Sequence, residues 1–143
     1  MWRTPSSQPS SLVGLSGADA ISANGKDQFA GTVLDQAAYW SSITASPTTL
    51  TTDLSNATGA ATSINDEDDV VGIAVWSTDA SDSSGDATLW TNGRPTDLPQ
   101  EIGRIGAYKL TSCTSINNQG VILATASAAA ASGDREQVVL APK

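Results

Sequence analysis

The chain has 143 residues, of which 15 are acidic and 7 basic, giving a formal net charge of −8. A surface of this sign repels nucleic-acid phosphates and anionic lipid headgroups, so we expect no nucleic-acid partner and no membrane insertion. The chain has no histidine, which excludes Ser-His-Asp and Cys-His catalytic sets and imidazole metal sites within one chain.

The N-terminal segment 1–17 divides into two parts. Residues 1–9 are rich in Ser and Pro and predict a tether, whereas residues 10–15, Ser-Ser-Leu-Val-Gly-Leu, predict a strand. Residues 1–5 lack the apolar core of a signal peptide, so we expect any export to use a removed leader or another route.

A strand-forming pattern then occurs three times. It opens at Ile21-Ser22, at Ser63-Ile64-Asn65 and at Ser115-Ile116-Asn117, and it continues through a turn into an apolar run. Aligning the isoleucines gives spacings of 43 residues (21 to 64) and 52 residues (64 to 116), and it requires two extra turn residues in the first copy. Repeats of this length are typical of blade-like β units.

The rest of each repeat predicts two more strands. A third strand ends in a large side chain at Trp40, Trp90 or Leu140, and a fourth carries Thr-Asp-Leu at 52–54 and 96–98. Asn92-Gly93 predicts a type I′ hairpin in the second copy, and Pro95 beside it favours an edge strand. The third copy lacks a fourth strand, which the strand at 10–15 is predicted to replace.

The sequence therefore predicts one all-β domain of three blade-like repeats, each of about four short antiparallel strands, either propeller-like or a compact β domain. We expect the tether and closing strand at 1–17 and the repeats at 18–59, 60–111 and 112–143. The Ala-rich tract 126–134 is predicted to be a loop or a β continuation. Cys113, the only cysteine, is predicted to be a small buried apolar residue.

The second repeat resembles the bacterial extracellular HAF repeat. The resemblance is carried by Ser63-Ile64-Asn65, Val70-Val71-Gly72, Ala87-Thr88-Leu89-Trp90 and Thr96-Asp97-Leu98, and the phrase for which the family is named is absent here. It implies a propeller-like arrangement of four-stranded blades, usually outside the cell, with no general biochemical activity. Fold analogy of this kind does not assign a function.

The acidic run 66–69 lies at a predicted turn, where clustered carboxylates are candidate calcium ligands. The candidate residues are Asp66, Asp68 and Asp69. The alternative is a solvated turn, because the glycine and distal glutamate of an EF-hand loop are missing.

Two variable loops, 79–86 and 99–109, are the candidate ligand-binding segments. Carboxylates beside aromatic side chains suit a sugar or a protein surface, and the candidates are Asp79, Asp82, Asp86, Trp76 and Tyr108. The alternative for the two aromatic residues is a place in the core.

The sequence offers no catalytic residue set, so we expect a protein that is not an enzyme; a carboxylate-pair hydrolase is the weakest alternative. We expect a non-enzymatic extracellular binding module for carbohydrate or protein, without a cofactor except possible calcium. The alternative is a structural self-associating protein, such as a phage decoration or tail protein or a surface-layer component. For both functions we expect a protein that is secreted or lies on a virion surface, and one that can form a homo-oligomer.

Overall fold

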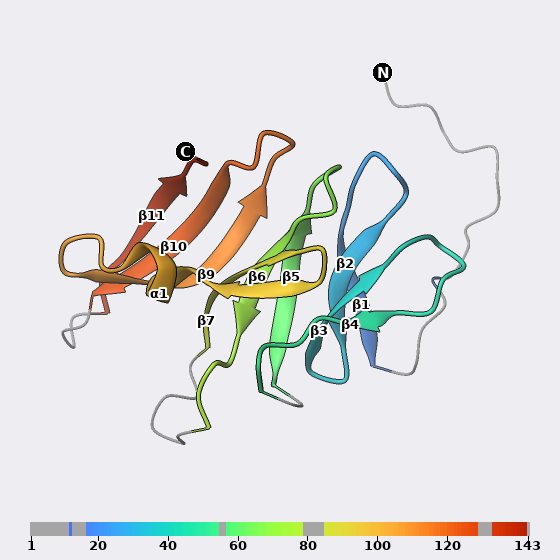
Figure 1. Ribbon diagram of the computed structural model, residues 1–143, viewed down its shortest axis with the longest axis horizontal. Helices are drawn as coiled ribbons and strands as arrows, with labels where there is room; N and C mark the ends of the chain where they lie inside the picture. The colour runs from blue at the N-terminus through green and yellow to red at the C-terminus, as the bar shows by residue number, and fades with distance from the viewer. Residues whose placement is uncertain (1–11, 13–16, 55–56, 79–84, 129–132, 143) are drawn as a thin grey trace.

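A computed structural model describes residues 12, 17–54, 57–78, 85–128 and 133–142. In these residues the chain is all-β and forms three antiparallel sheets, which we call units 1, 2 and 3 in chain order (Figure 1). Neighbouring strands within each unit are also neighbours in sequence, so each sheet has a simple up-and-down order. The fold class predicted from the sequence is confirmed at this level.

Units 1 and 2 each have four strands, and unit 3 has three. Unit 1 comprises β1 (Ala18–Ala23), β2 (Phe29–Val33), β3 (Gln36–Trp40) and β4 (Thr48–Thr49). Unit 2 comprises β5 (Gly59–Ile64), β6 (Val70–Ala74), β7 (Asp86–Thr91) and β8 (Arg94–Asp97). Unit 3 comprises β9 (Tyr108–Ile116), β10 (Ile122–Ala128) and β11 (Arg135–Leu140), and a short helix, α1 (Leu98–Ile102), precedes it. No helix in the described residues has the length and apolar content to cross a membrane.

The hairpin predicted at Asn92-Gly93 is confirmed. Both residues have positive φ, 53° and 74°, as a type I′ turn requires, and Thr91 pairs with Arg94 across it. Pro95 lies in β8, which is an edge strand of its sheet, as predicted. An edge strand tolerates a proline, because one of its sides has no neighbouring strand to which a backbone N–H would donate.

An asparagine, rather than an isoleucine, fixes the register of each unit. The side-chain oxygen of Asn65 accepts hydrogen bonds from the backbone N–H groups of Glu67 and Asp69, at 3.0 and 2.9 Å. Asn24 and Asn117 close the turns of units 1 and 3 in the same way. This Asx turn holds the backbone at the point where the first strand reverses into the second.

The alignment on Ile21 is therefore wrong. Counting from the asparagines, Ile21 occupies the position of Thr62, a bulged residue in the pairing of the first two strands, and its side chain is 59% exposed. The residue that matches Ile64 is Ala23, and no extra turn residues are present in unit 1.

The fourth strand of unit 1 also differs from the prediction. Thr49 pairs with Ala38 as Asp97 pairs with Thr88, so Thr48-Thr49-Leu50 is the counterpart of residues 96–98. Leu50 and Leu98 are both buried, whereas Thr52-Asp53-Leu54 follows the strand. The two fourth strands are therefore aligned by the leucine that follows each of them, because that leucine is buried in the core between two units.

Unit 3 begins earlier in the chain than predicted. β9 starts at Tyr108, ahead of the boundary at residue 112, because residues 108–110 pair with the second half of β10. β10 runs to Ala128, so the start of the Ala-rich tract continues the strand; residues 129–132 lie outside the described part.

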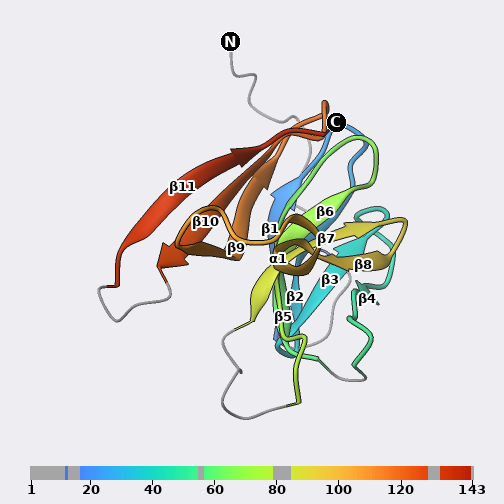
Figure 2. The same ribbon diagram turned by 60° about the vertical axis from the view of Figure 1, so that its left-hand side comes forward.

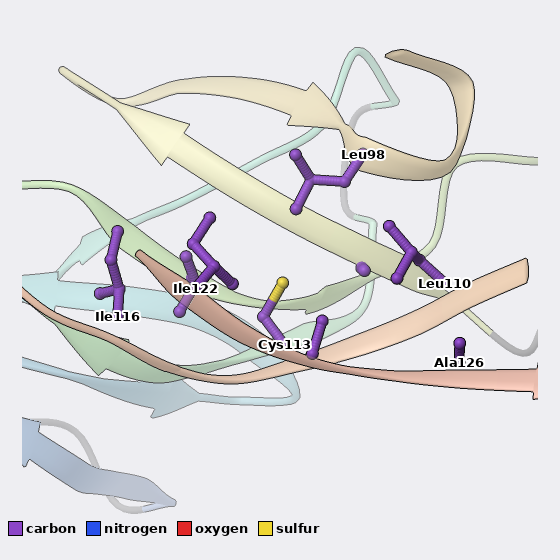
Figure 3. Packing of buried hydrophobic residues seen from close by; sticks show 9 residues of the cluster. Leu98, Leu110, Cys113, Ile116, Ile122 and Ala126 are labelled. Atoms are coloured by element: carbon purple, nitrogen blue, oxygen red, sulfur yellow. The ribbon is translucent and has the colours of Figure 1, made fainter. Parts of the chain in front are cut away.

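The sheets stack face to face in chain order, with unit 2 between units 1 and 3 (Figure 1). In the turned view, β9, β10 and β11 lie to one side of the other two sheets (Figure 2). One core lies between units 1 and 2 and includes Leu50, Ile64 and Trp90. A second lies between units 2 and 3, where Leu98 from the start of α1 meets Leu110, Cys113 and Ile122 (Figure 3). Cys113 is 1% exposed, which confirms its predicted buried position. Unit 2 is thus covered on both faces, and its inner strand β6, Val-Val-Gly-Ile-Ala, is apolar on both sides.

The predicted closing strand at 10–15 lies outside the described residues, apart from Leu12. That side chain packs against Val33, Ala38 and Trp40 of unit 1, at the opposite end of the stack from unit 3.

Candidate ligand-binding site

A polar hollow of about 500 Å³ lies beside the junction of unit 2, α1 and unit 3. Its lining includes two residues of the predicted set, Trp76 and Asp86, together with side chains from the segment 97–109. The residues on which the following description depends are Trp76, Asp86, Asp97, Gln100, Arg104 and Lys109.

Trp76 follows β6 and is half-buried, which leaves part of its ring exposed at the hollow. Its Nε1 donates a hydrogen bond to the Thr88 hydroxyl at 2.9 Å, and that hydroxyl donates in turn to the Asp86 carbonyl oxygen at 2.9 Å. Thr88 is fully buried in β7, so the indole is held from a rigid strand.

Asp86 opens β7 and is only 8% exposed. Its carboxylate forms an ion pair with Lys109 Nζ of β9 at 2.7 Å, which joins units 2 and 3 at the lining of the hollow. A carboxylate this deeply buried requires such a partner, because burial of an unpaired charge is strongly unfavourable.

The helix α1 carries Gln100 at the hollow, and Arg104 follows just after the C-cap residue Gly103. The helix was not predicted, since residues 99–109 were expected to form a loop. The signal is present in the sequence: Asp97 accepts a hydrogen bond from Gln100 N at 3.3 Å as an N-cap, and Pro99 follows at the first turn. The segment ends where Gly103 N donates to the Pro99 carbonyl oxygen.

Of the other predicted binding residues, only Tyr108 lies in the described part of the chain, and it does not line this hollow. Asp79 and Asp82 lie outside the described residues. Tyr108 packs against the core between units 2 and 3, and the Glu136 carboxylate near its hydroxyl raises its pKa through its charge and a hydrogen bond. Arg104 and Lys109 also line the hollow; both belong to the predicted binding segment 99–109, although neither was selected individually from the sequence.

The three candidate calcium ligands point to separate partners. Asp66 accepts from Gly25 N at 2.6 Å and from Asn118 Nδ2 at 2.7 Å, so it joins the turns of all three units. Asp68 lies 3.5 Å from Lys26 Nζ, and Asp69 accepts from Asn65 Nδ2 at 3.4 Å. Within the described residues, no group of three ligating side chains is arranged to hold a metal ion.

A second, more apolar hollow of about 480 Å³ lies between units 2 and 3, at the outer side of Leu140. The equivalent space between units 1 and 2 measures about 250 Å³ and is bordered by Trp90, whose Nε1 donates to the Thr51 carbonyl oxygen at 3.1 Å. Leu140 occupies the position of Trp90, because it pairs with Ile122 as Trp90 pairs with Val70. Leucine fills less of this space than tryptophan does, and the larger hollow is also bordered by Glu101 and Ile102 of α1.

Comparison of the chain with protein-family models, with curated proteins and with solved structures gives no match.

Proposed function

We propose that the protein is a non-enzymatic binding module that takes a neutral carbohydrate in the hollow beside Trp76. The observation that carries this proposal is the position of a half-exposed indole, fixed through Thr88, beside the Asp86–Lys109 ion pair. An aromatic face offers apolar stacking area, and the surrounding charged and amide groups offer both donors and acceptors to sugar hydroxyls.

The charges of the hollow favour an uncharged ligand. Asp86 and Asp97 are balanced by Arg104 and Lys109, although the whole chain carries a net charge of −8. A site without a dominant sign does not attract a phosphate or a strongly acidic group in preference to a neutral polar molecule. The stacked sheets support the description of the protein as a blade-like module. We propose as well that this module works outside the cell or on a virion surface.

A glycan array followed by titration calorimetry tests the proposal. We expect the wild type to bind a neutral glycan and Trp76→Ala to weaken that binding by about tenfold, as loss of one aromatic contact predicts. Tyr108→Phe is the matched control, because it changes an aromatic residue of the adjoining segment that does not line the hollow. Binding of no glycan by the wild type would overturn the proposal, as would equal loss in both variants.

A further inference from the structure

We propose that a second copy of this chain docks on the outer face of unit 3, with its strand β1 lying across β9, β10 and β11. The inference rests on the geometry of the two interfaces between units and is independent of the proposed carbohydrate site. We call the face that a unit turns toward the next unit its forward face, and the opposite one its rear face.

The forward faces are equivalent in the three units, but those of units 1 and 2 are covered by the next unit, whereas that of unit 3 is exposed to solvent. Val71 and Leu89 of unit 2 pack into the core shared with unit 3. Their counterparts in unit 3, by position relative to the asparagine and by strand pairing, are Leu123 and Val139. Val71 is 0% exposed, whereas Leu123 is 37% and Val139 68% exposed.

The polar groups that join successive units are also repeated on this face. The Ser22 and Ser63 hydroxyls accept from Ile64 N and Ile116 N of the following unit, at 3.3 and 3.2 Å. The matching groups of unit 3 are the Ser115 hydroxyl and Asn117 Nδ2. Both residues are exposed, and neither group bonds to any residue in the described part of the chain.

The complementary rear surface is present on β1 of the same chain. Ala61 and Ile64 of β5, and Cys113 and Ile116 of β9, are buried against the preceding unit. The residues at these positions in β1 are Ala20 and Ala23, and both are exposed. Leu12 contacts the outer part of the same rear face, near Trp40, and leaves these β1 side chains uncovered.

A second copy is therefore the occupant whose surface matches this face. Its Ala23 N and Asn24 carbonyl oxygen stand where Ile116 N and the Asn117 carbonyl oxygen stand in the interface between units 2 and 3. The contact joins two different surfaces, so it is head-to-tail and produces a closed ring or an open filament according to the rotation between copies.

Sedimentation velocity of the full chain over a range of concentrations, in a buffer with enough salt to screen the net charge, tests the proposal. We expect concentration-dependent assembly of the wild type and at least about tenfold weaker assembly for Val139→Lys or for Ala20→Lys. Both substitutions are at exposed positions, and circular dichroism with thermal melting checks that each variant is folded. Ile102→Lys is the control, because it places the same charge at an exposed position on α1.

Mixing the two interface variants distinguishes the head-to-tail arrangement from a symmetric one. Each variant retains one intact surface, so an equimolar mixture is expected to form a dimer that does not grow further. Assembly of Ala20→Lys alone at wild-type strength would show that two unit 3 faces pair with each other. That result, or a wild type that stays monomeric at every concentration, would overturn the proposal.

Discussion

The side-chain Nδ2 of Asn65 donates a hydrogen bond to the Asn117 carbonyl oxygen at 3.1 Å, and Asn24 makes the same bond to the Asn65 carbonyl oxygen at 2.8 Å. Asn24 and Asn65 thus each close the turn of their own unit with the side-chain oxygen and reach the next unit with the side-chain nitrogen. The two side chains differ in solvent exposure: Asn65 is 2% exposed, whereas Asn117 is exposed.

Replacing the nitrogen of Asn65 is expected to destabilise the protein more than the same change at Asn117. Asn65→Asp keeps the oxygen that closes the turn but places a carboxylate oxygen against the Asn117 carbonyl, at an expected cost of about 1–3 kcal/mol in the free energy of unfolding. Asn117→Asp is the matched control, with an expected change below about 0.5 kcal/mol for the monomer. Urea unfolding at low protein concentration measures both, and equal losses would contradict the inter-unit role of Asn65 Nδ2.

Gly72→Ala is expected to destabilise unit 2 by about 1–3 kcal/mol or more. A Cβ at this position would lie 2.0 Å from the Ala60 carbonyl oxygen of the neighbouring strand, so the backbone of β5 or β6 must move. Unit 3 carries Ala124 at the same position, and its pairing with β9 has a second register shift just beyond it, between Thr125 and Ala126. Thermal melting of Gly72→Ala against Ala124→Gly checks the difference; a Gly72→Ala variant as stable as the wild type would show that the close approach is absent.

The buried thiol of Cys113 is expected to make the protein less stable at alkaline pH. Burial raises its pKa to about 12 from 9.0, so above pH 9 the thiol ionises in the unfolded chain before it does in the folded one. The unfolded state then binds fewer protons, and the free energy of unfolding is expected to fall by up to about 1.4 kcal/mol per pH unit between pH 9 and 12.

Cys113→Ala is the control, because units 1 and 2 carry Ala20 and Ala61 at this position. The variant is expected to lose this part of the alkaline slope while keeping the part due to Tyr39, whose pKa burial also raises. Denaturant unfolding at several pH values compares the two proteins. A wild type and variant with the same slope would contradict the burial of the thiol.

Much of the fold follows from local sequence patterns, and the errors have a physical origin. Asn92-Gly93 identified its hairpin because two positive φ values strongly restrict the residues that fit. The repeat was found, but its register was displaced in unit 1, because Ile21 is apolar and yet bulges into solvent, whereas the matching residue is only Ala23. Burial at that position comes from a preceding unit, which local sequence does not reveal.

The candidate site could be predicted less completely than the fold, because it also depends on contacts between units. Trp76 and Asp86, two of the residues predicted from the sequence, both line the hollow, because Trp76 closely follows β6 and Asp86 opens β7, the strand that pairs with β6. The ion pair of Asp86 with Lys109 joins two units, and it depends on how those sheets stack. The three acidic residues of the turn at 66–69 were grouped because they are close in sequence, but the tight Asx turn directs their side chains to different partners.

Amide hydrogen exchange at Ile64 and Ile116 tests the central claim, that one interface is repeated between the units. Each amide donates to a serine hydroxyl of the preceding unit, so both are expected to exchange slowly. Ser22→Ala should accelerate exchange at Ile64 and leave Ile116 unchanged, and Ser63→Ala should do the reverse. Fast exchange at both amides in the wild type, or no selective effect of either serine substitution, would contradict the stacked arrangement of equivalent units.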